Sequence, residues 1–350
     1  MIPPVRTILI GSVAVLAFGG SVLLMGFERP PVTTVQQGFR GLGMEHVVNP
    51  RTLPTTLVAN AVPEAEPPIE PSGVKSSEAY ENVQVLGDLD SNEFLRLMQA
   101  ITNWVSPDNG LPGQGCAYCH ADGEALSSDS LYTKIVARRM LQMTQHINAQ
   151  WQSHVGVTGV TCYTCHRGKN VPENIWFANA GPTQPMGMVG NRAGQNYPAP
   201  NAAFASLPYD AFTPFLDEAN PIRVISTTAL PAGNRASTKQ TEWTYSLMTH
   251  MSESLGVNCT YCHNSRSFFA WDQSPPTRSI AWYGIRMVRD VNNAFLTPLG
   301  PQYPVHRLGP QGDPPLGNCA TCHAGAFKPL LGAPMLADYP ELGVVSTSTP

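Results

Sequence analysis

The eight cysteines of this 350-residue chain form four Cys-X-X-Cys pairs, and a histidine follows each pair directly. The four segments read CAYCH, CYTCH, CTYCH and CATCH, and no cysteine is left over. The cysteines are Cys116, Cys119, Cys162, Cys165, Cys259, Cys262, Cys319 and Cys322, and the histidines are His120, His166, His263 and His323. Paired thiols can serve as redox dithiols, zinc ligands, disulfide partners or attachment points for a prosthetic group.

The histidine after every pair separates these alternatives. Redox dithiols do not need a histidine there, and zinc sites do not need one at the same offset in every pair. Covalent haem c needs all three residues, because two thiols bond to the porphyrin vinyl groups and the adjacent histidine reaches the iron. The sequence therefore predicts four covalently bound haems c rather than structural zinc or disulfides.

Each iron also needs a sixth ligand, and methionines recur before the motifs at matched places. Met98 in LMQAITNWV and Met248 in LMTHMSESL occupy the same position of a repeat, and Met140 precedes the second motif. A single helical methionine is more often core packing, but this repetition favours all three as iron ligands. Met143 and Met251, one turn further on, are the alternatives.

The residues alone leave the sixth ligand of the fourth haem open. The repeat of ARRMLQMT in GIRMVRDV pairs Met287 with Met140 and favours Met287. A distant histidine is an equal alternative, with His306 nearest in sequence and His154 just after the predicted second helix.

A helix is predicted before each motif. Residues 91–105 carry apolar side chains at helical spacing, with Ser91 as the N-cap. Further helices are predicted at about 131–151, 241–255 and 277–295. The paired repeats indicate that a two-haem unit is duplicated, with each helix packed against porphyrin.

The predicted fold is mainly α with long irregular loops, because 33 prolines and 30 glycines interrupt the chain. Residues 7–27 carry no charge, and a helix of that length spans about 30 Å of hydrocarbon. A cleaved signal peptide usually has a shorter apolar core, so a retained transmembrane anchor is predicted. Arg6 before the span places the amino end in the cytoplasm and the haem domain outside.

The expected divisions of the chain follow from these features. They are a cytoplasmic end at 1–6, the transmembrane anchor at 7–27, an extended proline-rich arm at 28–75, a first two-haem unit at 76–173, a connector at 174–239, a second two-haem unit at 240–340 and a tail at 341–350. The arm is expected either to tether the globule or to lie along a membrane partner.

The chain resembles the tetrahaem cytochrome c subunit of the photosynthetic reaction centre of purple bacteria. The resemblance runs from GFRGLGMEHV near residue 38, through CYTCHRG, ARRM, GVNCTYCHN, GIRMVRD and RLGPQG, to DYPELG near residue 338. It implies a mostly helical fold with four haems in a row. It also assigns Met98, Met140 and Met248 to the first three haems and His154, in place of Met287, to the fourth.

The resemblance implies an electron carrier without substrate chemistry of its own. Electrons would pass from a soluble periplasmic donor, either a basic cytochrome c or a high-potential iron-sulfur protein, to the photo-oxidised bacteriochlorophyll pair. The expected partners are the L and M subunits, with H and the surrounding light-harvesting complex, at the periplasmic face of the photosynthetic membrane. A membrane-anchored multihaem oxidoreductase, either a quinol dehydrogenase or a nitrite-reductase-like enzyme, is the alternative. The catalytic enzyme is disfavoured because the ligands fill every iron position. The quinol dehydrogenase is disfavoured because it would more often use paired histidines than helical methionines.

The net charge of −4 is distributed unevenly along the chain. Residues 60–130 contain twelve acidic and two basic residues, whereas residues 131–170 contain five basic residues and no acidic one. An acidic surface steers a basic partner, so a basic donor is expected to dock near the first haem. The candidates for pairing with haem propionates are Arg138, Arg139, Arg278, Arg286 and Arg289.

Overall fold

The computed structural model describes residues 5–26, 31–36, 44–179, 181, 197–224 and 238–343. Several predicted segments lie wholly or partly outside these ranges. They are the start of the cytoplasmic end, the GFRGLG stretch at 38–43, much of the connector and the tail after residue 343.

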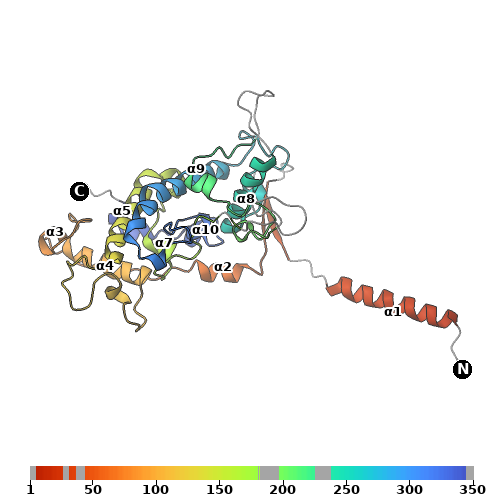
Figure 1. Ribbon diagram of the computed structural model, residues 1–350, viewed down its shortest axis with the longest axis horizontal. Helices are drawn as coiled ribbons and strands as arrows, with labels where there is room; N and C mark the ends of the chain where they lie inside the picture. Colours follow the sequence, from red (N-terminus) through yellow and green to blue (C-terminus); the bar gives the residue numbers. More distant parts are fainter. Residues whose placement is uncertain are drawn as a thin grey trace.

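The described chain is mainly helical, as predicted, and contains one two-stranded sheet (Figure 1). The longer helices are α1 (Val5–Gly26), α4 (Ser91–Val105), α5 (Tyr132–Gln150), α8 (Thr238–Leu255) and α9 (Pro276–Val291). The shorter α-helices are α2 (Leu53–Ala59), α3 (Ser76–Ala79), α6 (Gln152–Val155), α7 (Cys162–His166) and α10 (Cys319–His323). The 3-10 turns are η1 (Gly115–Tyr118), η2 (Pro200–Ala202), η4 (Cys259–Tyr261), η6 (Thr297–Gln302), η7 (Val305–Arg307), η8 (Pro329–Gly332), η9 (Met335–Asp338) and η10 (Pro340–Gly343). The π turns are η3 (Thr213–Asp217) and η5 (Asn292–Leu296).

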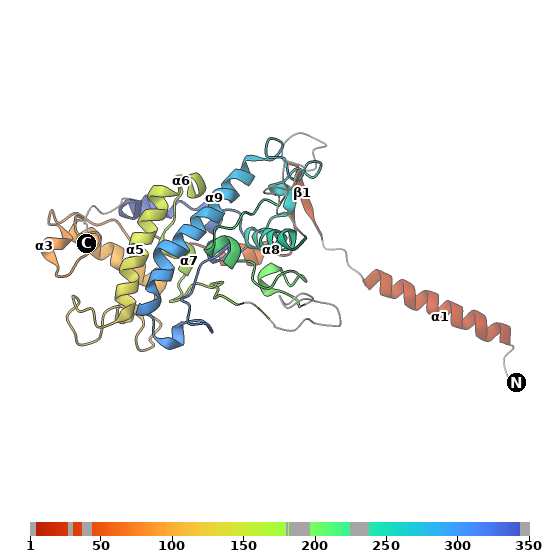
Figure 2. The same ribbon diagram turned by 45° about the horizontal axis from the view of Figure 1, so that its top comes forward.

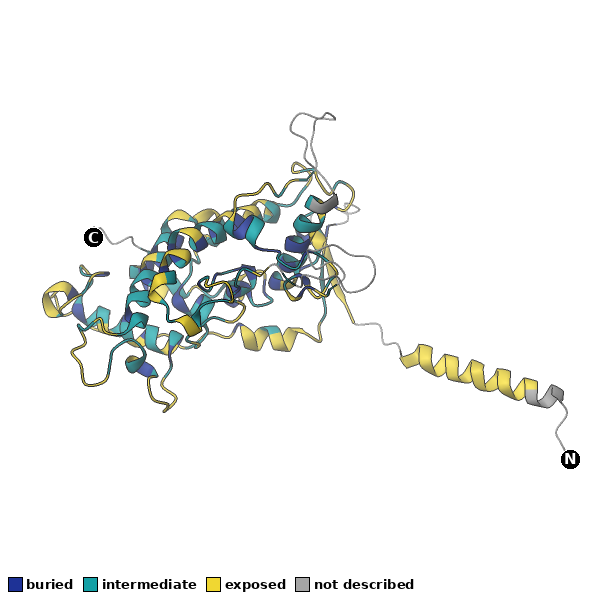
Figure 3. Ribbon diagram, in the orientation of Figure 1, coloured by how far each residue is buried: buried dark blue, intermediate teal, exposed yellow. Residues whose placement is uncertain are grey.

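Helix α1 stands apart from the globule and is exposed along its described side chains (Figure 3). Within it, Leu9–Gly26 has a mean hydropathy of 2.1, which is enough by length and composition for a membrane span. The helix predicted at 7–27 is therefore confirmed, with a start two residues earlier. It extends from the end of the globule that holds β1 and α8 (Figure 2), opposite the end that holds α3 and α4 (Figure 1).

The four helices predicted before the motifs are present, with two corrections. The N-cap of α4 is Asp90 and not Ser91, because the Asp90 carboxylate accepts a hydrogen bond from the backbone N–H of Asn92 at 2.9 Å. The same carboxylate also accepts from Gly73 of the arm at 2.8 Å. Helix α9 ends at Val291, and the chain continues as the π turn η5.

One hydrophobic core lies between α4, α5, α7 and the carboxyl end of the described chain. Leu97 and Trp104 of α4 are buried there together with Tyr339 and Leu342. The rings of Trp104 and Tyr339 meet edge to face, with centroids 4.7 Å apart. The last described residues therefore return to pack against the predicted first unit.

A second core lies around α8 and α9 and depends on the connector. Leu247 of α8 and Ile285 of α9 pack with Phe212, Phe215 and Leu216, which are almost completely buried. The sequence predicted a joining loop at 174–239. Its described part instead supplies Phe212 and Phe215, two buried aromatic side chains, to this core.

The proline-rich arm lies along the globule and contains a hairpin and a helix that its composition did not predict. Strands β1 (Thr33–Gln36) and β2 (Glu45–Val48) pair antiparallel, with Thr33 opposite Val48. The backbone N–H of Val47 donates to Asn258, which precedes the third motif, at 3.0 Å. The arm then passes through α2 to the first unit, where Gly73 meets Asp90. These contacts fix the arm against both halves of the globule.

Candidate haem-binding centre

The four motifs adopt two local structures that alternate along the chain. The first and third motifs form the 3-10 turns η1 and η4, whereas the second and fourth form the single-turn helices α7 and α10. In α7 the Thr161 N–H donates to Thr164 Oγ1 at 3.0 Å, and in α10 the Asn318 N–H donates to Thr321 Oγ1 at 2.9 Å. A side-chain hydroxyl thus holds the start of both helices.

The four motif histidines share one orientation. The Nδ1 atom of each contacts a backbone carbonyl a few residues further along the chain. The pairs are His120 with Leu126 at 3.0 Å, His166 with Lys169 at 2.9 Å, His263 with Phe268 at 2.8 Å and His323 with Ala326 at 2.9 Å. A carbonyl only accepts, so Nδ1 carries the proton and Nε2 keeps the lone pair that an iron ligand needs.

Burial keeps these imidazoles neutral. Desolvation lowers the pKa of His120, His166 and His263, and it lowers the pKa of His323 to about 4. A histidine must be neutral to ligate a metal. The motif histidines are therefore prepared for iron at neutral pH.

Most of the thiols with a shifted pKa do not resemble those of a redox dithiol. All eight cysteines lie in the described part of the chain and are free. Burial raises the pKa of Cys119 and Cys162 to about 11 and that of Cys319 to about 12, whereas reactive dithiols have lowered values. Cys322 is the exception, because a hydrogen bond from Cys165 lowers its pKa. Among the described residues, His, Cys, Asp and Glu side chains form no group of three that could hold a bare metal ion. These observations agree with thiols that are bonded to a prosthetic group.

His154 of α6 faces His323 of the fourth motif. The two ring centroids lie 6.1 Å apart with an interplanar angle of 66°. An iron between two imidazoles lies about 2 Å from each nitrogen, and each ring centre lies about 1 Å further, so the expected separation is about 6 Å. The Nδ1 atom of His154 contacts the Ile280 carbonyl at 2.9 Å, which leaves its Nε2 available. The residues present therefore fit a haem iron held between His154 and His323.

A glycine makes room for His154. A Cβ atom on Gly284 of α9 would lie 2.5 Å from His154 Cε1, closer than side chains tolerate.

Thr133 donates to the Tyr118 carbonyl and Thr277 donates to the Tyr261 carbonyl. The two threonines therefore occupy equivalent places at the starts of α5 and α9.

The two threonines also give the register between α5 and α9. Met140 lies seven residues after Thr133, and Gly284 lies seven residues after Thr277. The residue that corresponds to Met140 is thus Gly284, and the sequence repeat that paired Met140 with Met287 is one helical turn out of register. Met287 corresponds to Met143 and is buried in the protein interior.

The three predicted methionine ligands lie on the expected helices and are partly buried. Met98 of α4 packs at the edge of the first core and Met248 of α8 at the edge of the second. Met140 lies on α5, where its carbonyl accepts from Thr144 Oγ1 at 2.9 Å. His306, the other histidine alternative for the fourth haem, is exposed in η7. The methionine assignments remain predictions.

One backbone contact recurs in both halves. The N–H of Gly168, two residues after the second motif histidine, donates to the Trp104 carbonyl at 2.8 Å. The N–H of Gly325, two residues after the fourth, donates to the Ser254 carbonyl at 2.8 Å. Trp104 and Ser254 are the penultimate residues of α4 and α8. The second and fourth motifs are therefore tied to α4 and α8 by the same type of contact.

The second and fourth motifs are neighbours at the centre of the molecule. Helix α7 contacts α4 on one side and α10 on the other, and α10 contacts α8. The guanidinium of Arg167 donates to the Cys322 carbonyl at 2.6 Å and to the side chain of Asn60 at 3.3 Å. Asn60, which the sequence analysis did not single out, also donates to the Ala324 carbonyl at 3.1 Å. The contacts therefore run in the order α4, α7, α10 and α8, and the first and third motifs follow α4 and α8 in the chain.

Comparisons with known proteins agree with this geometry. The family model described as Photosynthetic reaction centre cytochrome C subunit matches residues 28–343. Similar proteins include the photosynthetic reaction center cytochrome c subunits of Rubrivivax gelatinosus, at 52% identity over 95% of this chain and 89% of the relative, and of Thermochromatium tepidum, at 48% over 97% and 81%. The corresponding subunit of Roseobacter denitrificans is 41% identical over 96% of this chain and 92% of its own length.

Proposed function

The chain belongs to the family of photosynthetic reaction centre cytochrome c subunits, and on that premise we propose that it relays electrons through four covalently bound haems. Family membership gives its electron-transfer role in the reaction centre, its covalent haem c and its association with the membrane. The number of haems, their ligands, the path and the partners are the proposal. A c-type haem supplies a one-electron iron couple when it is bound.

We assign each haem to one motif, with its two cysteines as thioether anchors and its histidine on the iron. The sixth ligands are Met98, Met140 and Met248 at the first three sites and His154 at the fourth. The observation that carries this proposal is the shared orientation of the motif histidines, in which a backbone carbonyl binds Nδ1 and leaves Nε2 for iron. The separation of 6.1 Å between the His154 and His323 rings supports the fourth assignment.

The spatial order of the motifs supports a path from the first site, through the second and fourth, to the third. Helix α1 leads into the β1–β2 hairpin, and the backbone of Glu45 in β2 accepts from Thr260 of the third motif at 2.6 Å. The third site therefore lies at the end of the globule from which the anchor extends (Figure 1). That end is proposed to rest on the L and M subunits at the periplasmic face, beside the bacteriochlorophyll pair.

The surface around the first motif supports docking of a soluble basic donor. Asp108, Asp122 and Glu124 are exposed there, and Leu111 and Leu126 expose 62% and 70% of their surface among them. Acidic groups accelerate encounter with a basic protein, whereas apolar contacts stabilise the complex once it forms. A basic cytochrome c or a high-potential iron-sulfur protein fits this surface.

The division of the chain is part of the same proposal. Segments 76–173 and 240–340 are two copies of a two-haem unit, joined by the connector at 174–239 and anchored through residues 7–27 and the arm at 28–75. Their alternating motif structures and recurring backbone contacts support the duplication. The amino end lies in the cytoplasm. Residues 341–343, which were expected in the tail, belong to the globule because Leu342 is buried in the first core.

A redox titration followed by optical spectra tests the proposed function. The purified protein is expected to show four one-electron haems, three of them with the weak sulfur-to-iron band at the red end of the visible spectrum. Their potentials should be mostly positive, because a methionine ligand raises the iron potential. A high-spin iron that binds nitrite or peroxide would contradict the proposal and favour an oxidoreductase.

A further inference from the structure

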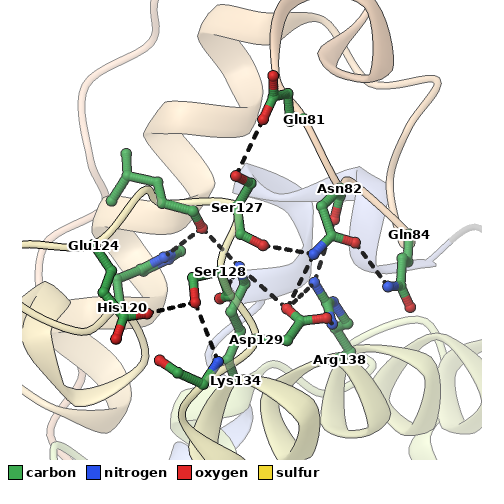
Figure 4. A network of polar contacts seen from close by, with 12 residues as sticks. Glu81, Asn82, Gln84, His120, Glu124, Ser127, Ser128, Asp129, Lys134 and Arg138 are labelled. Atoms are coloured by element: carbon green, nitrogen blue, oxygen red, sulfur yellow. Dashed lines mark hydrogen bonds and ion pairs between the residues drawn. The ribbon is translucent and has the colours of Figure 1, made fainter.

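The loop after the first motif is held by a dense polar network (Figure 4). Within it, the Leu126 carbonyl accepts from two donors, namely His120 Nδ1 at 3.0 Å and Lys134 Nζ at 2.6 Å. The iron-binding histidine and a lysine ammonium therefore share one acceptor.

Lys134 is committed to this position. Only 9% of the Lys134 surface is exposed, and such burial is rare for a lysine unless its charge is paired. Its ammonium also donates to the Ser128 carbonyl at 2.7 Å and lies 3.3 Å from Asp129 Oδ1. Arg138 binds both oxygens of the Asp129 carboxylate at 2.8 Å, so this carboxylate is already neutralised by a second cation.

No other described motif shares its carbonyl in this way. At the third motif, the equivalent cation Arg278 donates to the carbonyls of Ala270 at 2.9 Å and Phe269 at 3.4 Å, whereas His263 uses Phe268. The sharing is therefore a property of the first site and not a general feature of the fold.

We propose that Lys134 is a positioning residue that raises the reduction potential of the first haem by competing with His120 for the Leu126 carbonyl. This inference rests on the proposed haem at His120. A carbonyl that binds an ammonium has less electron density for its second donor, so the His120 hydrogen bond is weakened. A weaker bond at Nδ1 makes the imidazole a poorer electron donor to the iron.

Both electrostatic consequences of Lys134 act in the same direction. A poorer donor ligand stabilises ferric iron less, and a buried positive charge near the ligand also disfavours the ferric state. Glu81 and Glu124 accept from Ser127 and Ser128 and are exposed, so solvent screens their negative charge more than the positive charge of the buried Lys134. Lys134 would therefore keep the entry site able to accept an electron from a soluble donor.

The test is a redox titration of the Lys134→Met variant in the intact membrane-bound reaction centre complex. The equilibrium constant for reducing the first haem is expected to fall about tenfold, which lowers its reduction potential by about 59 mV for a one-electron couple. The reduction potentials of the other three haems should not change. The largest g value of its ferric electron paramagnetic resonance signal should decrease, because His120 gains imidazolate character. Lys134→Arg should restore both values.

The matched control is Asn82→Gly, which removes donors to Ser127 at 2.6 Å and to Asp129 at 3.0 Å but leaves the Leu126 carbonyl untouched. Glycine suits this position because Asn82 has a φ of 61°. An unchanged potential in Lys134→Met, or an equal shift in Asn82→Gly, overturns the proposal. If Lys134→Met does not assemble, Lys134→Gln must give a shift of the same sign. The wild-type titration tests the four-haem proposal separately, since it must show four haems whatever Lys134 does.

Discussion

The two halves of the globule use the same framework but complete it differently. In both, a 3-10 motif is followed by a threonine that binds its turn. In both, a glycine N–H after the single-turn helical motif donates to the end of the long helix that precedes the 3-10 motif, namely α4 or α8. The halves differ inside the long helices. Met140 of α5 is replaced by Gly284 of α9, and the space beside Gly284 holds His154 from the other half.

This difference connects the two halves. If both halves supplied all their own ligands, each could fold around its own pair of haems. His154 contacts the Ile280 carbonyl of α9 and faces His323, so in the proposed ligand assignment the first half completes the fourth site. The arm and the returning carboxyl end reinforce the same connection.

The most severe test of the comparison is Gly284→Ala. The new Cβ would lie 2.5 Å from His154 Cε1, so the ring must leave its place beside His323. We expect the fourth haem to lose its sixth ligand and to give a high-spin optical and electron paramagnetic resonance signal, while the other three stay low-spin. The matched control is Gly317→Ala. Its new Cβ would lie 3.6 Å from the nearest atom, Asn292 Oδ1, which is an ordinary contact distance. A low-spin fourth haem in Gly284→Ala would refute the assignment of His154.

The next effect is a change of ligand type at the same site. His154→Met should raise the reduction potential of the fourth haem, because methionine stabilises ferrous iron. The equilibrium constant for its reduction should increase on the order of a thousandfold. The redox titration should show the other three potentials nearly unmoved. Met287→Leu should leave all four potentials in place, since Met287 corresponds to Met143 in the other half. If Met287→Leu shifts the fourth haem instead, the register deduced from Thr133 and Thr277 is wrong.

A pH effect should distinguish the stability of the two halves. The buried His250 of α8 and the buried Ala100 of α4 occupy equivalent positions, because each lies two residues after the matched methionine, Met248 or Met98. Desolvation lowers the pKa of His250 from 6.5 to about 4. The folded form therefore resists a proton that the unfolded form accepts, and stability falls as the pH decreases from 6.5 towards 4.

Hydrogen exchange at pH 7 and pH 5 measures this difference. After correction for intrinsic rates, protection of α8 should fall by about 2 kcal/mol while that of α4 changes little. His250→Gln should remove the extra loss in α8. Equal changes in α4 and α8 would show that another group controls acid stability.

The smallest expected effect concerns donor docking at the first half. Asp122→Lys reverses an exposed charge beside the first motif and should slow electron delivery from a basic donor about fivefold at low salt. Flash-induced kinetics should show this difference shrinking as ionic strength increases, because salt screens exposed charges. Asp272→Lys, an exposed change near the third motif, should have little effect. A rate that is independent of salt in the unmodified protein would exclude electrostatic docking.

The sequence by itself determined the chemistry of the sites and the elements that carry them. Four Cys-X-X-Cys-His segments with no spare cysteine specify covalent haem, because the reaction requires neighbouring residues. Helical spacing in 91–105 and an uncharged run at 7–27 predicted α4 and α1, because periodicity and length are local properties. A local prediction failed where two polar residues adjoin, since Asp90 caps α4 in place of Ser91.

Only the tertiary structure decided how these sites are joined. The pairing of His154 with His323, the space at Gly284 and the central place of Asn60 depend on contacts between residues far apart in the chain. The sequence repeat that aligns ARRM with GIRM placed Met287 one turn away from its structural equivalent, because a helix repeats its face every turn and short matches do not fix the register. The sharing of the Leu126 carbonyl by His120 and Lys134 likewise depends on the path of a loop, which no local pattern specifies.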